Sequence, residues 1–181
     1  MLVKRRRLLS SIGIATGVGA GLITGSEAAA SAPAGLIGTW SLRSWRAIAA
    51  DGEISYPFGR EAQGRITYEP SGRMSVQLMR RDRPRFASDD PKIGTPQEFE
   101  EAFRGFFAYF GAYRVDSRQG VVIHAIEACS FPNWIGREQV RHFTLQGDQL
   151  VLQRKPSPPA PGSDPAPPDP LHELTWDRLP S

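Results

Sequence analysis

Apolar and polar residues alternate along most of the chain from residue 36 onward, which is the pattern of half-buried β-strands. In a first segment, residues 37–48, Trp40 and Leu42 share one phase. Two further alternating segments follow, one ending at Tyr68 and the next beginning at Arg73, with the turn sequence Pro-Ser-Gly between them. This order predicts a β-hairpin.

The alternation stops at residues 80–95, where prolines, aspartates and a glycine predict a loop. Thr95 is a suitable N-cap, Pro96 suits the first helical position, and Glu98 stands where a capping box requires an acidic residue. We expect a helix from here to about residue 107, which either packs to close one end of the barrel, the favoured interpretation, or forms a mobile lid there. Its apolar residues follow the spacing of a single helix face; they are Phe99, Ala102, Phe103, Phe106 and Phe107.

Strand character resumes after the helix and continues to the C-terminus, in segments 109–115, 121–130, 138–146, 150–152 and 171–178. Eight prolines between residues 156 and 170 exclude a strand or helix there and predict an extended loop. The pattern therefore predicts a mainly β fold, an eight-stranded up-and-down antiparallel β-barrel with one α-helix inserted after the third strand. Such a barrel is filled by side chains or holds one small ligand.

The N-terminal segment has the three parts of an export signal. Residues 4–7 are basic, residues 8–24 are apolar and small, and residues 28–32 offer small-residue cleavage sites. The pair Arg5-Arg6 resembles the twin-arginine export motif, and the glycine-rich core is too weakly apolar for a membrane anchor. We therefore predict a signal peptide over residues 1–32 and a single domain over 33–181, delivered to the periplasm or secreted.

The predicted cleavage changes the charge of the protein. Residues 1–32 hold four of the 22 basic residues and one of the 19 acidic residues, which leaves eighteen of each in the mature chain. A neutral domain without a basic stripe is not expected to bind nucleic acid, and no membrane insertion of the mature protein is expected. No phosphate loop, serine nucleophile elbow or paired-cysteine ligand set is present, so we expect no cofactor.

Several short motifs follow one another along the chain. They are Gly38-Thr39-Trp40, Tyr56-Pro57-Phe58-Gly59, the run from Gly72 to Met79, the run from Arg83 to Ala87, Tyr109-Phe110-Gly111 and Phe131-Pro132-Asn133-Trp134. These motifs resemble those of the bacterial and fungal lipocalin-like domain family. The first is similar to the Gly-x-Trp signature of lipocalins, and Arg178 would be the arginine that closes against that tryptophan. The proline-rich insertion departs from the family pattern. The resemblance implies an up-and-down barrel with a ligand-sized interior, but no particular activity.

Strand phase indicates which polar side chains face the barrel interior. Phe143 and Leu145 predict that Arg141 points inward and His142 outward, while Val122 and Ile126 predict an inward His124. Because the two histidines fall on opposite faces, we expect no metal site. A buried Arg141 needs an acceptor. That acceptor is either Glu127, if its strand contains a bulge, or an anionic ligand group.

The remaining candidate ligand-binding residues come from strands and one loop. Tyr68 and Tyr113 lie in alternating strands, and Gln77 faces inward only if its apolar neighbours face the helix. Trp134 lies in a loop at one barrel end, where it either lines the mouth or plugs it.

Three functions fit this pattern. The first is an exported binder of a small apolar or amphipathic molecule, without enzymatic activity. The second is a cofactor-free isomerase or cyclase that uses His124, Glu127 or Arg141 in the same pocket. The third is a structural or protein-interaction module. No catalytic residue and no oligomeric state follows from the sequence.

Overall fold

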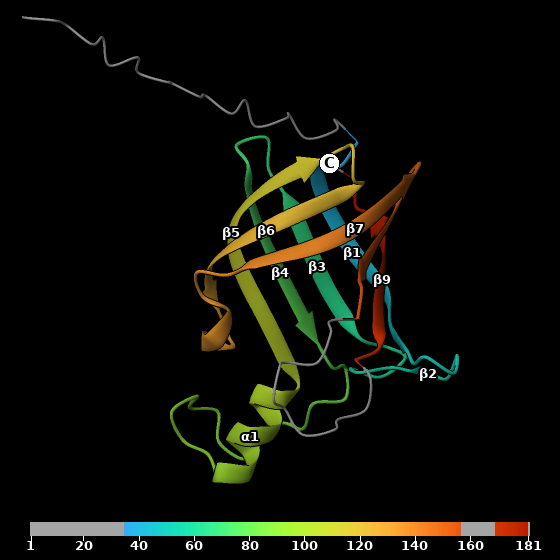
Figure 1. Ribbon diagram of the computed structural model, residues 1–181. Helices are drawn as coiled ribbons and strands as arrows, with labels where there is room; N and C mark the ends of the chain where they lie inside the picture. Colours follow the sequence, from blue (N-terminus) through green and yellow to red (C-terminus); the bar gives the residue numbers. More distant parts are fainter. Residues whose placement is uncertain (1–34, 157–168, 181) are drawn as a thin grey trace, which may run out of the picture.

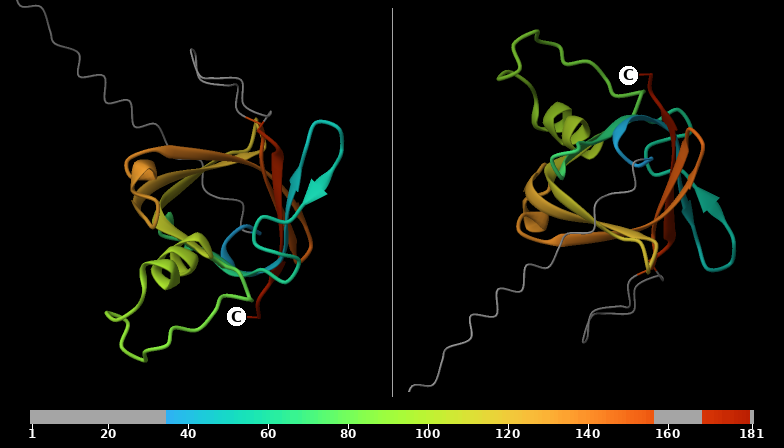
Figure 2. Two further views of the ribbon diagram at one scale, coloured as in Figure 1. Left: turned by 90° about the horizontal axis from the view of Figure 1, so that it is seen from below. Right: turned by 90° about the horizontal axis from the view of Figure 1, so that it is seen from above.

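The computed structural model describes residues 35–156 and 169–180, whose strands form one closed antiparallel sheet (Figure 1). Eight strands pair in sequence order, and β1 also pairs with β9, which closes the ring seen along the axis in Figure 2. The predicted eight-stranded barrel is confirmed. Its strands are β1 (Gly38–Ile48), β3 (Gln63–Tyr68), β4 (Arg73–Met79), β5 (Phe106–Asp116), β6 (Val121–Cys129), β7 (Glu138–Gln146), β8 (Gln149–Arg154) and β9 (Leu171–Arg178).

The alternating pattern places one side chain in two inside the barrel. In β4, Met74, Val76 and Leu78 are buried while their neighbours are more exposed. Burying an aliphatic side chain of this kind stabilises a fold by roughly 1.5–3 kcal/mol. A short strand, β2 (Ile54–Ser55), pairs with the end of β1 and lies outside the ring.

One end of the barrel, here called the Trp40 end, is closed by its own side chains. The fully buried Trp40 donates from Nε1 to the carbonyl oxygen of Leu36 at 3.1 Å. The Arg178 guanidinium lies 4.0 Å from the centre of the Trp40 ring and donates from Nη1 to the carbonyl oxygen of Ile37 at 2.9 Å. This cation–π contact confirms the expected partnership of Arg178 with the tryptophan of the Gly-x-Trp motif.

The opposite end, here called the α1 end, carries the helix α1 (Pro96–Arg104) and the short 3-10 helix η1 (Pro132–Trp134) (Figure 1). The capping box is confirmed, because Glu98 N donates to Thr95 Oγ1 at 3.2 Å and Thr95 N donates to Glu98 Oε2 at 2.7 Å. The helix is shorter than predicted. Gly105 ends it, and Phe106 already belongs to β5, where it pairs with Met79.

Because Phe106 and Phe107 belong to β5, the helix lacks part of the apolar face expected for it. No residue of α1 is buried, and the side chains of Phe99 and Phe103 are 42% and 55% exposed. Phe99 packs on Phe86 of the preceding loop, with 5.3 Å between the ring centres. The helix therefore stands beside the barrel end instead of sealing it, which corrects the expectation of a packed closure.

The structure does not describe two of the segments predicted from the sequence. The predicted signal peptide, residues 1–32, and most of the proline-rich loop, residues 156–170, lie outside the described residues. Within residues 35–156 and 169–180, none of the helices has the length and apolarity needed to cross a membrane.

Candidate functional site

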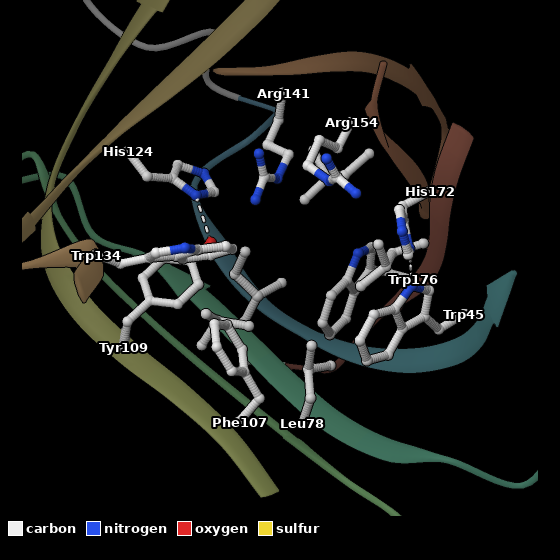
Figure 3. A pocket seen from close by; sticks show the side chains of 14 residues that line it. Trp45, Leu78, Phe107, Tyr109, His124, Trp134, Arg141, Arg154, His172 and Trp176 are labelled. Atoms are coloured by element: carbon white, nitrogen blue, oxygen red, sulfur yellow. Dashed lines mark hydrogen bonds between the residues drawn. The ribbon is translucent and has the colours of Figure 1, made fainter. Parts of the chain in front are cut away.

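A cavity of about 360 Å³ lies inside the barrel (Figure 3). Its lining includes Phe107 and Trp134, which come from the elements at the α1 end. Most of its wall is apolar, and four polar side chains interrupt it. Trp45 and Phe107 also line a second hollow of about 270 Å³, which Phe103 and Phe131 border beside α1. The cavity lining consists of the aromatic residues Trp45, Phe107, Tyr109, Trp134 and Trp176, the aliphatic residues Ile66, Val76, Leu78, Leu152 and Leu174, and the polar residues His124, Arg141, Arg154 and His172.

The four polar residues come from four consecutive strands, β6 to β9. In Figure 3 the guanidinium groups of Arg141 and Arg154 point into the same space, and Phe107 and Leu78 face them from the other side. Neighbouring antiparallel strands bring these residues together, because Val122 of β6 pairs with Arg141 of β7, and Arg154 of β8 pairs with His172 of β9. The cavity therefore has a polar wall and an apolar wall.

His124 is held between two tyrosines. Its Nε2 lies 2.8 Å from the Tyr68 hydroxyl, and its Nδ1 lies 2.8 Å from the Tyr109 hydroxyl. Burial, followed by the nearby positive charge of Arg141, lowers the pKa of His124 to about 3. Burial raises the pKa of both tyrosines. All three groups are therefore uncharged at neutral pH.

Arg141 is a buried cation, with only 8% of its surface exposed. Its Nη1 donates to Gln139 Oε1 at 3.2 Å and to the carbonyl oxygen of Val140 at 3.0 Å, and both acceptors are neutral. Across residues 35–156 and 169–180, no carboxylate forms an ion pair with this guanidinium. A buried charge is costly unless it is paired. The charge of Arg141 is thus uncompensated in the described part of the chain.

Arg154, the other arginine of the polar wall, has a carboxylate partner. Arg154 donates from Nη1 and Nη2 to the two carboxylate oxygens of Asp169, at 2.5 Å and 2.8 Å. Beside it, Trp45 Nε1 donates to His172 Nδ1 at 3.0 Å. Burial, followed by the charge of Arg154, lowers the pKa of His172. Since Asp169 neutralises Arg154, Arg141 supplies the net positive charge of the cavity.

The structure brings three of the predicted site residues into the cavity wall, namely His124, Trp134 and Arg141. Tyr68 is inside the barrel and reaches the site through His124, but does not line the cavity. Tyr113 packs edge-on against Tyr68 and donates to the Glu69 carbonyl oxygen at 2.9 Å, toward the Trp40 end.

The two other predicted residues lie outside the barrel. Gln77 falls in the phase opposite Val76 and faces outward. Glu127 does sit at a bulge, because Ala128 and Ile126 pair with consecutive residues of β5 and leave Glu127 without a partner in the ladder. Its carboxylate is exposed and accepts two hydrogen bonds of 2.6 Å from Arg73. Glu127 is therefore not the acceptor for Arg141, and the catalytic set of His124, Glu127 and Arg141 is not assembled.

Several lining residues were not predicted, although the sequence carries a signal for some. Tyr109 shares the phase of Tyr113, and Leu174 shares that of Trp176, so strand phase alone would have placed both inside. Arg154 shares the phase of Leu152, and His172 shares that of Leu174, so strand phase also turns these two polar side chains inward. They reach the cavity because β8 and β9 run to the α1 end, which depends on the register of the closed sheet.

No group of three or more His, Cys, Asp or Glu side chains among the described residues is placed to hold a metal ion. His124 is buried inside the barrel, while His142, on the neighbouring strand, lies in the phase opposite Arg141.

Comparison with known proteins adds two findings. A family model described as a lipocalin-like domain matches residues 37–179. The chain is also 36% identical over 85 residues to the protein named 4'-hydroxy-3'-methoxypropiophenone carrier protein ppsC from Aspergillus oryzae (strain ATCC 42149 / RIB 40). That similarity covers 44% of this chain and 77% of the relative. With the closed barrel and its Trp40–Arg178 contact, these matches establish that the chain belongs to the lipocalin-like domain family.

Proposed function

We propose that this protein binds and carries a small, largely apolar molecule in the cavity of its barrel. The observation that carries the proposal is the cavity itself, which is about 360 Å³ in volume and has a mainly apolar and aromatic wall. Ligand sites of proteins are typically cavities of about 300–1,000 Å³ with apolar walls and a few placed polar groups. A molecule of one or two aromatic rings matches this space.

The relative from Aspergillus oryzae supports the same proposal. It is named as a carrier of a propiophenone that bears a hydroxyl and a methoxy group, which is a small aromatic ketone. A carrier needs a cavity and a way in, and here the hollow beside α1 lies next to the cavity and shares Trp45 and Phe107 with its wall. The α1 end is the proposed entrance, because Trp40 and Arg178 close the other end.

The test is a titration with N-phenyl-1-naphthylamine, a neutral aromatic probe whose fluorescence rises in apolar surroundings. The wild-type protein is compared with Val76→Phe, which fills the cavity from β4, and with Ser75→Phe, which adds the same ring in the opposite phase of that strand. Val76→Phe should weaken binding at least tenfold, about 1.4 kcal/mol, while Ser75→Phe should not. Equal binding by all three proteins would place the probe elsewhere and refute the proposal.

We also propose that the carrier acts outside the cytoplasm, in the periplasm or as a secreted protein. The basic, apolar and small-residue parts of residues 1–32 support this location. Fractionation of cells that express the full chain should recover a shortened protein outside the cytoplasm, and Arg5→Lys/Arg6→Lys should retain it inside. Full-length protein in the cytoplasm of both strains would contradict the export proposal.

A further inference from the structure

The polar wall of the cavity offers hydrogen-bond donors but lacks a matching set of acceptors. The Arg141 guanidinium carries five N–H groups and cannot accept a hydrogen bond. Its hydrogen bonds to Gln139 and Val140 both come from Nη1, and its further interaction is with the Tyr109 hydroxyl, so none of these partners is a carboxylate. The indole Nε1 of Trp176, a residue that is 1% exposed, has no acceptor among the described residues.

The hydrogen bonds around His124 add a third donor. Two tyrosine hydroxyls and one neutral imidazole carry three protons, yet they share only two hydrogen bonds. One hydroxyl proton is therefore left over. Tyr68 is 1% exposed, lies off the cavity, and has no other acceptor in the described residues, so a leftover proton there would be a buried, unsatisfied donor.

The arrangement that avoids this cost fixes the tautomer of His124. Tyr68 donates to Nε2, and Nδ1–H donates to the oxygen of Tyr109. The proton of Tyr109 is then free, and Tyr109 lines the cavity. Arg141 and Tyr109 line the same cavity, where Figure 3 shows both side chains, and the positive charge of Arg141 acts to lower the pKa of Tyr109.

We infer that the natural ligand is a small aromatic molecule bearing an anionic oxygen, such as a carboxylate or phenolate, which binds Arg141 and Tyr109. The inference rests on the proposed carrier function and specifies its ligand class. A guanidinium without a carboxylate partner in an apolar cavity selects an anion, because the anion supplies the charge that the described residues lack. Arg154 does not compete for it, because Asp169 already occupies its guanidinium.

The experiment uses two probes that share one apolar body. The first, 8-anilinonaphthalene-1-sulfonate, bears an anionic sulfonate, and the second, N-phenyl-1-naphthylamine, is its uncharged counterpart. Both are titrated into the wild-type protein, into Arg141→Met, and into Arg65→Met, which removes one exposed positive charge from β3 on the outside of the barrel. Arg141→Lys keeps the charge but not the planar group.

Arg141→Met should weaken the binding of the sulfonate probe about ten- to hundredfold, and should leave binding of the neutral probe within about threefold. Arg141→Lys should recover part of the loss, and Arg65→Met should change neither affinity. Equal changes for both probes in Arg141→Met, or none for the sulfonate, would overturn the inference while leaving the carrier function standing. Binding of neither probe to the wild-type protein would overturn both.

Thermal unfolding of the same variants separates ligand binding from a structural role. If Arg141 serves a ligand, Arg141→Met removes a buried, unpaired charge, and the midpoint of unfolding should stay the same or rise. A marked fall in the midpoint, or a failure of Arg141→Met to fold, would show that the guanidinium is needed by the fold itself and would overturn the inference.

Discussion

At the scale of single residues, His124 connects the stability of the barrel to the chemistry of its cavity. It is 1% exposed and bonded to Tyr68 and Tyr109, and its pKa is about 3 in the folded protein. An unfolded histidine has a pKa of about 6.5. As the pH falls below that value, the unfolded chain takes up a proton that the folded protein does not. The free energy of unfolding therefore has its full value above the pKa of His124 in the unfolded chain. It decreases as the pH falls from there toward the pKa of His124 in the folded protein.

This direction of the pH dependence gives a prediction for His124→Asn, which removes the titrating group. Between about pH 7.5 and about pH 5.5, the free energy of unfolding of the wild-type protein should fall by about 1.4 kcal/mol more than that of the variant. The measurement is urea unfolding at both pH values. Carboxylates with lowered pKa, such as Glu138, titrate mostly below this range, and His172 contributes equally to both proteins. Parallel losses in the two proteins would show that His124 is not held neutral.

The sequence predicted the direction of several site residues but not their depth in the barrel. Strand phase placed His124 and Arg141 inside, as the structure has them. It could not distinguish Tyr113, which lies toward the Trp40 end, from Tyr109, which lines the cavity. The position of a side chain along the barrel axis depends on the register and tilt of all the strands together. Alternation within one strand determines neither the register nor the tilt.

At the scale of elements, the pairing of β5 with β6 depends on a single glycine. The ladder shifts by one residue between Phe110 and Gly111, and the bulge turns Glu127 outward to Arg73. A Cβ atom on Gly111 would overlap the carbonyl oxygen of Ala125, which belongs to the backbone and cannot rotate away. A bulge was foreseen as a condition for Glu127 to reach Arg141, but its direction depends on this close approach.

Gly111→Ala should therefore destabilise the barrel by about 2 kcal/mol or more, because the new methyl group forces the two strands apart. Gly105→Ala is the matched control, because the nearest atoms to its new methyl group are in the flexible side chain of Arg83, and it should cost less than about 1 kcal/mol. Urea unfolding of both variants measures the difference. Equal costs would show that the β5–β6 register tolerates a side chain at the bulge.

The boundary between α1 and β5 shows what helix spacing alone leaves undetermined. Phe99, Phe103, Phe106 and Phe107 fit one helix face, and the capping box at Thr95 marked the start correctly. The helix spacing predicts the C-terminal end of α1 too late in the sequence. Gly105 stops the helix, and Phe106 and Phe107 pair with residues of β4. Tertiary pairing thus overrides a helical pattern, and two aromatic side chains move from the expected helix face to the sheet.

At the scale of the whole molecule, the two barrel ends differ. The Trp40 end is closed by an arginine stacked on a buried tryptophan, and the α1 end holds exposed aromatic residues beside the cavity. The fold class and strand order are predictable because most strands carry a two-residue period and short connections favour pairing between successive strands. The open interior was not predictable, because it depends on how completely the side chains of all eight strands fill the barrel.

The proposed function requires that a small molecule occupies the barrel interior, and nuclear Overhauser effects between a bound probe and the protein test this most directly. With N-phenyl-1-naphthylamine and methyl-labelled protein, we predict cross-peaks from probe protons to the methyl groups of Ile66, Leu152 and Leu174, which line the cavity from three strands. Cross-peaks confined to exposed methyl groups, such as those of Val140 and Ile135, would contradict binding inside the barrel, because these side chains do not line the cavity.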